Sequence, residues 1–181
     1  MNTKLNTPLT IVLVILCCVC IAFSVYSSKK FSKRLPVNSK VAEPLTLLAV
    51  SKLSRRDSVV NFSLGYLGKP YIYGACTKDG FDCSGFVYYV FKNFNIAVPR
   101  SSSEYSNYGK TVEISTVKKG DILVFLSPTR NEIGHLGIVT TANGMNSEFI
   151  HAATGKEMKV IITKLNTEHY TRRFVKAIQV L

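Results

Sequence analysis

One cysteine and two histidines have the types and the chain order needed for nucleophilic catalysis. Cys83 lies in the run GFDCSGF, and His135 and His151 follow far downstream in apolar, strand-like runs. A thiol attacks well once a neighbouring group lowers its pKa or removes its proton. One imidazole can act as that base, and a second can hydrogen-bond its far nitrogen and fix its tautomer. The three residues therefore predict a catalytic set of Cys83, His135 and His151.

The residues after Cys83 predict a helix that positions the thiol. Apolar side chains recur with the period of one helical face, at Phe86, Val87, Val90, Phe91 and Phe94. Cys83 then lies in the first turn, where the partial positive charge of the helix N-terminus favours the thiolate. Asp82 precedes it and is of a residue type that caps helices. We expect Asp82 to cap a helix running from Cys83 to about residue 95.

Other chemistries fit the same residues less well. Structural zinc sites use closely spaced pairs of ligands, whereas Cys83, His135 and His151 are widely separated, so we expect no metal. No phosphate-binding glycine loop or paired catalytic carboxylates occur, so we expect no cofactor. The competing interpretation of a single strand histidine is a structural one. Cys76 is expected to be a small loop residue, and His169 a surface residue.

The remaining pattern predicts an α+β domain. Helices are expected at residues 56–67 and 83–95, with a short one beginning near residues 99–104. Strands are expected at residues 121–126, 135–141, 148–152, 159–165 and 174–181. Helices followed by strands indicate N-terminal helices packed on a mostly antiparallel sheet of five to six strands. A nucleophile on a helix facing a histidine on a strand is the papain-like layout.

The chain before this domain divides into two predicted segments. Residues 1–28 contain an apolar run long enough to cross a membrane, so they are expected to be a signal peptide or a membrane anchor. Lipidation at Cys17, Cys18 or Cys20 is a third option. Residues 29–57 are expected to be a basic linker, since residues 29–56 hold eight Lys or Arg against Glu43. The folded domain is then residues 58–181.

Charge bears on both partner and topology. More than half of the net charge of +12 lies in residues 1–60, which suits anionic lipid headgroups or wall polymers. Nucleic acid is not expected, because the linker lacks interleaved aromatic residues. The basic flank after the apolar run would keep the C-terminal part in the cytoplasm under the positive-inside rule. The family resemblance given below implies export instead, and the two indications conflict.

Several stretches of the sequence resemble a known family. They are residues 68–74 (GKPYIYG), 81–87 (FDCSGFV), 98–102 (VPRSS), 119–125 (KGDILVF), 134–139 (GHLGIV), 149–152 (FIHA) and 170–174 (YTRRF). With them, residues 58–181 resemble the NlpC-type family of bacterial cell-wall cysteine peptidases, and within it most closely the Spr-type murein endopeptidases.

The resemblance implies roles for individual residues. Cys83 would be the nucleophile, His135 the general base and His151 the residue that orients it. Tyr71 would join the Cys83 backbone N–H in stabilising the oxyanion. Three further positions match the substrate groove of the family: Asp82, Ser84 and Arg100.

Alternatives to the groove roles remain open. Asp82 serves either a substrate amine or the helix cap alone, and Arg100 either meets a stem-peptide carboxylate or braces the fold. The sequence departs from the family at Cys76 and Tyr105 and in a longer segment between the two histidines. The last departure affects the rim of the groove.

The resemblance also implies an activity and its setting. The expected enzyme is a thiol endopeptidase that cuts peptide stems or crosslinks of peptidoglycan through an acyl-enzyme. An amidase or acyltransferase with the same triad is the alternative, as is a wall-binding module without turnover. The expected partners are muropeptides and, through the N-terminal apolar segment, a membrane. We expect a monomer at the bacterial cell envelope, exported and either anchored or secreted.

Overall fold

The computed structural model describes residues 54–181. The predicted signal or anchor segment and most of the predicted linker lie outside these residues. Residues 54–57, which the sequence analysis assigned to the linker, form the cap and first turn of a helix. Within residues 54–181 no helix has the length and apolar character needed to cross a membrane.

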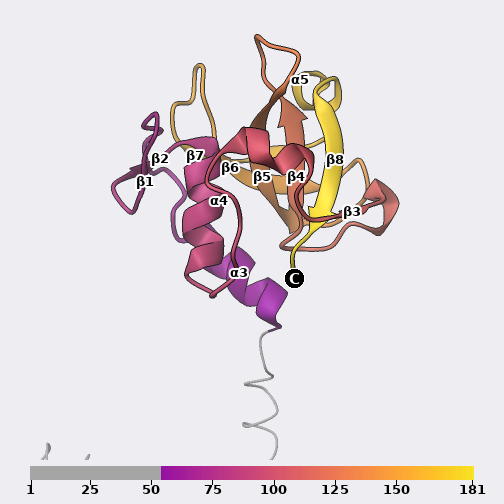
Figure 1. Ribbon diagram of the computed structural model, residues 1–181, viewed down its shortest axis with the longest axis horizontal. Coiled ribbons are helices and arrows are strands. Elements are labelled where there is room, and N and C mark those ends of the chain that lie inside the picture. The colour runs from indigo at the N-terminus through magenta and orange to yellow at the C-terminus, as the bar shows by residue number, and fades with distance from the viewer. Residues whose placement is uncertain (1–53) are drawn as a thin grey trace, which may run out of the picture. The chain divides into compact units, whose positions relative to one another are not determined.

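Two main helices precede the sheet, as predicted (Figure 1). Helix α3 spans Arg55–Leu64, and the side chain of Ser54 accepts a hydrogen bond from the Asp57 N–H at its start. Helix α4 spans Cys83–Lys92, three residues shorter than expected because residues 93–95 form a turn. Arg56 donates to the buried Asp121 at 2.7 Å and to the carbonyl of Leu181 at 2.9 Å. The fold therefore begins before residue 58, since this arginine ties helix α3 to the sheet.

A six-stranded antiparallel sheet follows, with the strand order β3-β8-β4-β5-β6-β7. Its strands are β3 (Lys110–Val112), β4 (Ile122–Leu126), β5 (Ile133–Thr141), β6 (Glu148–Ala152), β7 (Val160–Lys164) and β8 (Phe174–Gln179). Five of them match predicted strands, and β3 is a short edge strand that pairs with β8. The predicted α+β class and mostly antiparallel sheet are confirmed.

Short elements complete the domain. Strands β1 (Cys76–Thr77) and β2 (Gly80–Phe81) form a small hairpin just before α4. The helix expected near residue 101 is a 3-10 turn, η1 (Ser102–Ser106), in which Glu104 accepts from the Ser101 N–H. A second 3-10 turn, η2 (Ile114–Thr116), and the one-turn helix α5 (Glu168–Thr171) were not predicted.

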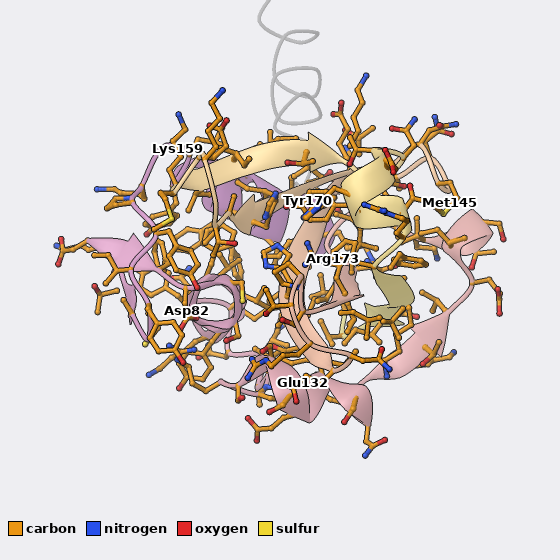
Figure 2. All side chains as sticks on the ribbon, turned by 90° about the horizontal axis from the view of Figure 1, so that it is seen from above. Asp82, Glu132, Met145, Lys159, Tyr170 and Arg173 are labelled. Atoms are coloured by element: carbon orange, nitrogen blue, oxygen red, sulfur yellow. The ribbon has the colours of Figure 1, made fainter. Side chains whose placement is uncertain are left out.

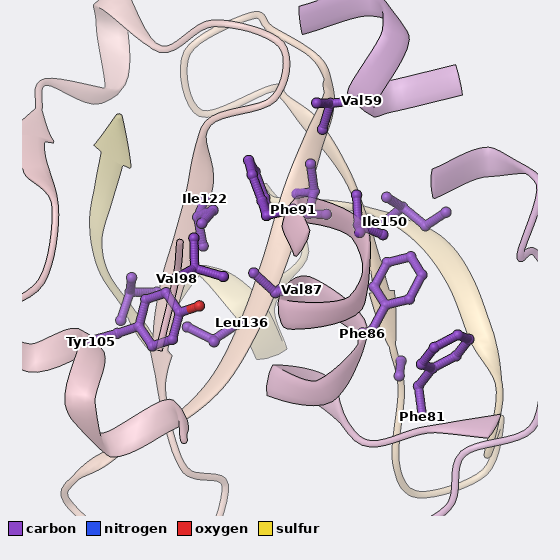
Figure 3. Packing of buried hydrophobic residues seen from close by; sticks show 14 of the residues in the cluster. Val59, Phe81, Phe86, Val87, Phe91, Val98, Tyr105, Ile122, Leu136 and Ile150 are labelled. Carbon is purple, nitrogen blue, oxygen red and sulfur yellow. The ribbon is translucent and has the colours of Figure 1, made fainter. Parts of the chain in front are cut away.

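Alternation along the strands builds a hydrophobic cluster on each face of the sheet. On β4, Ile122 and Val124 join the larger cluster, whereas Leu123 and Phe125 join the smaller one. Helix α4 covers the larger cluster with the apolar face predicted from its sequence (Figure 3). Full burial of a large apolar side chain contributes about 1.5–3 kcal/mol, so this contact holds the start of α4 firmly against the sheet.

Candidate active site

His135 and His151 lie on neighbouring strands and form a hydrogen-bonded pair. Nε2 of His135 on β5 is 2.9 Å from Nδ1 of His151 on β6, and both rings are buried. Alternation puts both rings on the same face as the smaller cluster, against Phe125 and Tyr170. The strand pairing between β4 and both its neighbours shifts register at Phe125, directly opposite His135. Such irregularities re-aim side chains beside functional sites.

Thr163 on β7 extends this pair by one further residue. Its hydroxyl Oγ1 is 2.9 Å from Nε2 of His151, so both nitrogens of the His151 ring have a partner. Thr163 was not among the residues predicted from the sequence. An ordinary β-branched residue in a strand carries no signal of its own, and only the pairing of β6 with β7 brings it to the histidine.

Both histidines of the pair are neutral near physiological pH. Burial lowers the pKa of His135 well below its usual value, and the neighbouring His151 and Arg173 also disfavour its protonated form. Burial also lowers the pKa of His151 to about 3, with Arg173 as the next cause. A neutral imidazole has one nitrogen that accepts, so His135 is in the form that a general base needs.

Cys83 lies at the first position of α4, beside the start of β5. Its thiol donates a weak hydrogen bond to the carbonyl oxygen of Gly134 at 3.7 Å. The pKa of Cys83 is raised to about 11, mainly by burial and next by the negative charge of Asp82. Hydrogen bonds from the N–H groups of Ser84 and Leu136 lower this pKa in part. We expected the helix N-terminus to favour the thiolate. Burial and the nearby carboxylate outweigh it, so the resting residue is a thiol.

Tyr71 lines a cavity together with Cys83 and Gly134. It lies in the loop before β1, where its N–H donates to the carbonyl of Met158. Burial raises the pKa of the Tyr71 phenol to about 12, with Cys83 as the next cause. The phenol therefore keeps its proton and can donate a hydrogen bond into the cavity.

Asp82, Ser84 and Arg100 form one hydrogen-bonded network. Asp82 Oδ1 accepts from the Gly85 N–H at 2.5 Å, which confirms that Asp82 caps α4. Arg100 donates to Asp82 Oδ1 at 3.0 Å and to Asp82 Oδ2 at 2.9 Å, and it also reaches the Ser84 hydroxyl at 3.1 Å. Its remaining bonds go to the carbonyls of residues 74 and 75. Arg100 thus braces the loop against the helix start.

Two cavities meet at Cys83. One, of about 320 Å³, is lined by Cys83, Tyr71 and the Asp82–Ser84–Arg100 network. The other, of about 210 Å³, is lined by Cys83, His135 and Tyr170, with Arg173 and His169 at its wall. Both cavities are lined by Tyr71, Cys83 and Gly134, so both adjoin the thiol.

The remaining candidate residues have simpler surroundings. Cys76 lies on β1 and is a free thiol, and Tyr105 is fully buried with its hydroxyl donating to the Pro99 carbonyl at 3.1 Å. His169 is exposed, as expected, yet it lines the cavity that contains His135. Within residues 54–181 no group of three or more potential ligands is arranged to hold a metal ion.

Comparisons with known proteins show which sequences and structures this chain resembles. A probable endopeptidase of Haemophilus influenzae is 30% identical over 75% of this chain and 76% of its own length. The murein DD-endopeptidase MepS/murein LD-carboxypeptidase of Escherichia coli K12 is 36% identical over 73% of this chain and 66% of its own. An NlpC/P60 family protein from Bacillus cereus has a similar structure, with a TM-score of 0.63 and 30% identity, covering 72% of this chain and 41% of that one.

The sequence profile of the NlpC/P60 family matches residues 68–179, a span that contains Tyr71, Cys83, both paired histidines and all six strands of the sheet. The match and these identities agree with the resemblance seen in the sequence. This chain belongs to the NlpC/P60 family.

Proposed function

We propose that this protein is a cysteine peptidase that hydrolyses peptide bonds of peptidoglycan, with Cys83 as nucleophile. The observation that carries the proposal is that Cys83 and His135 line one cavity, and that His135 is hydrogen-bonded to His151. Relatives with the same family domain are named as murein endopeptidases, which supports peptidoglycan as the substrate. The chain spans 66% of the Escherichia coli relative, so the activity is proposed for the domain described here.

The hydrogen-bond partners indicate which nitrogen of each histidine carries the proton. His135 Nε2 is committed to His151, which leaves Nδ1 of His135 to accept the Cys83 proton. His135 then donates through Nε2 to His151 Nδ1, and His151 donates through Nε2 to the Thr163 hydroxyl. Thr163 is therefore a positioning residue, because an acceptor at this place keeps both imidazoles in the tautomer that a base needs.

The reaction begins from a neutral thiol and a neutral imidazole. His135 takes the Cys83 proton as the sulfur attacks the amide carbonyl, and the tetrahedral oxyanion accepts hydrogen bonds from Tyr71 and the Cys83 N–H. The protonated His135 then gives its proton to the leaving amine, and a thioester forms. Water attacks the thioester with His135 again as base, which releases the acid and restores the thiol.

The Asp82–Ser84–Arg100 network forms one wall of the larger cavity and is proposed to hold the acyl part of the substrate. Asp82 already accepts hydrogen bonds from Arg100 and from the N–H of Gly85 at the helix start. These bonds favour a role in bracing the fold over a role in binding a substrate amine. Substrate contact would then come from the Ser84 hydroxyl and from the part of Asp82 that lines the cavity. This network shapes the groove and fixes the first turn that carries Cys83.

Product analysis of digested peptidoglycan tests the proposal. Purified sacculi are incubated with the protein and with its Cys83→Ala variant, and the released fragments are identified by mass. A peptidase yields fragments shortened or separated at peptide bonds, which the variant does not release. Amide-cleaved glycan free of peptide would indicate the amidase alternative, and acyl-transfer adducts the transferase. Equal release by the variant, or none by the wild type, would refute the proposal.

The site of action is proposed to be the bacterial cell envelope. The named relatives act on murein, which lies outside the cytoplasmic membrane, and the apolar N-terminal residues offer a means of export or anchoring. The intact mass of the mature protein extracted from membranes distinguishes a cleaved signal, a lipid anchor and a retained segment. Its sedimentation in detergent tests the proposed monomer.

A further inference from the structure

The two cavities beside Cys83 differ in their access to the proposed general base. The smaller cavity is lined by His135, whereas the larger cavity is not. In the proposed reaction His135 must reach the nitrogen of the leaving residue to protonate it. The residue that leaves therefore occupies the smaller cavity, and the acyl part occupies the larger one. The smaller cavity has a volume of about 210 Å³, against about 320 Å³ for the larger one.

Arg173 is the fixed cation of this smaller cavity. Its Nε donates to the carbonyl of Leu126 at 2.8 Å, its Nη1 donates to Nε2 of His169, and its guanidinium lies over the ring of Tyr170 at 5.5 Å. Tyr170 and Arg173 lie together near the centre of the face seen in Figure 2, with Asp82 to one side. Three contacts thus hold the side chain in place before any ligand arrives.

No acid neutralises this arginine within the described residues. Its neighbour Arg172 pairs with Glu168, and Arg130 at the cavity rim pairs with Glu132, but Arg173 has no carboxylate partner in residues 54–181. Among these residues no Asp or Glu lines the cavity at all. A half-buried guanidinium held without a counter-ion is a site prepared for an anion, and a carboxylate matches its planar donors.

His169 completes the arrangement as a neutral acceptor. Its pKa is lowered by partial burial and by Arg173, so the ring accepts the Arg173 hydrogen bond rather than repelling the guanidinium. The contact fixes one nitrogen of the guanidinium, and we find no acceptor within residues 54–181 for the other terminal nitrogen, Nη2. That nitrogen remains for a ligand.

We propose that Arg173 binds a free carboxylate on the leaving residue, and that the enzyme therefore selects amide bonds whose nitrogen belongs to a residue with an unblocked α-carboxylate. The inference rests on the proposed function and deepens it. A leaving residue whose chain continues has that carboxyl in an amide bond, without charge. Only a residue at the end of a peptide, or one joined through a second amine on its side chain, presents the charge that Arg173 receives.

A pair of peptide substrates tests the selection. The two are identical peptidoglycan peptides except that the leaving residue ends in a carboxylate in one and a carboxamide in the other. We expect wild-type kcat/KM to be about tenfold to a hundredfold higher for the carboxylate, the range of one charge-assisted contact. Arg173→Gln should abolish this preference, so that the ratio of kcat/KM for the carboxylate peptide to kcat/KM for the carboxamide peptide falls to about one.

The neighbouring arginine provides the matched control. Arg172→Gln removes the same charge one residue away, from an exposed side chain that does not line the cavity, and should keep the wild-type preference. A structural role for Arg173, or a role in stabilising the thiolate, predicts an equal loss with both peptides, and that result would overturn the inference. The urea midpoint of Arg173→Gln checks that this variant folds. The ratio of kcat/KM for the two peptides with the wild-type protein tests the selection without any variant.

Failure of the inference and failure of the proposed function give different results. Equal cleavage of both peptides by the wild type refutes the carboxylate site and leaves the peptidase intact. Cleavage of neither refutes the peptidase, and calorimetry with Cys83→Ala then decides the site separately. Tighter binding of the carboxylate peptide would support the site, and equal binding would overturn it.

Discussion

The buried, neutral histidine pair should make this fold sensitive to mild acid. Burial lowers the pKa of both His135 and His151, and that of His151 lies at about 3 in the folded chain against an ordinary 6.5. The unfolded chain therefore binds protons between pH 6.5 and about 3 that the folded chain does not. Because the unfolded state takes up more protons in this window, the free energy of unfolding falls as the pH falls.

The size of the effect follows from the two pKa values. Each histidine whose folded and unfolded pKa values are well separated contributes up to about 1.4 kcal/mol per pH unit. At pH 4.5, two units below the ordinary value of 6.5, His151 alone then removes about 3 kcal/mol, and His135 adds to it in the same direction. Domains of this size have about 5–15 kcal/mol in total, so the loss is a large part of the stability.

Urea unfolding at a series of pH values from about 7.5 to 4.5 measures this slope, in a range that leaves most carboxylates ionised. The variant His151→Gln should unfold more easily at every pH but with a slope smaller by about 1.4 kcal/mol per pH unit. His169→Gln is the control, since that histidine is exposed and should change the slope far less. An unfolding free energy that stays constant from pH 7 to 4.5, or an unchanged slope in His151→Gln, would refute the burial argument.

Three substitutions probe the rest of the site. Thr163→Val removes the acceptor at the end of the relay, so kcat should fall about fivefold with KM unchanged, the effect of one hydrogen bond, and an unchanged kcat would contradict the relay. Tyr71→Phe should lower kcat about a hundredfold in the same assay if its hydroxyl stabilises the oxyanion, whereas a change in KM alone would assign it to substrate binding. Gly85→Ala would place a methyl group on the Ala75 carbonyl oxygen, so the urea midpoint should fall by the equivalent of about 1–3 kcal/mol; an unchanged midpoint would show that the loop moves freely.

Much of the fold could be predicted because local patterns and tertiary contacts agree. The apolar face of α4 and the apolar runs of β4 to β8 correspond to observed elements, since their side chains pack into the two hydrophobic clusters. Strand β3 could not be predicted, because three residues with only Val112 partly buried carry no periodicity of their own. Its existence depends on the edge of β8, which lies almost 70 residues away along the chain.

Some residues of the site could likewise be predicted from the sequence, whereas others could not. Cys83 and the two histidines could be proposed from the sequence because cysteine and histidine are rare and their order is informative, and the structure pairs the two histidines at 2.9 Å. Thr163 and Arg173 are common residue types whose significance arises only from pairing of β6 with β7 and from the missing counter-ion. The thiol pKa was predicted in the wrong direction, because a sequence shows the helix start but not the burial that outweighs it.

The central claim is that Cys83 is the nucleophile, and the protein contains its own control. Cys76 is the other cysteine of the described residues; it is also free, lies seven positions earlier on β1, and does not line either cavity. The measurement is kcat/KM on a purified crosslinked muropeptide for Cys83→Ala and Cys76→Ala, with urea midpoints confirming that both fold. With Cys83 as the nucleophile, we expect no turnover in Cys83→Ala and near wild-type turnover in Cys76→Ala. Residual turnover in a folded Cys83→Ala, above that of the peptide alone, would contradict this role.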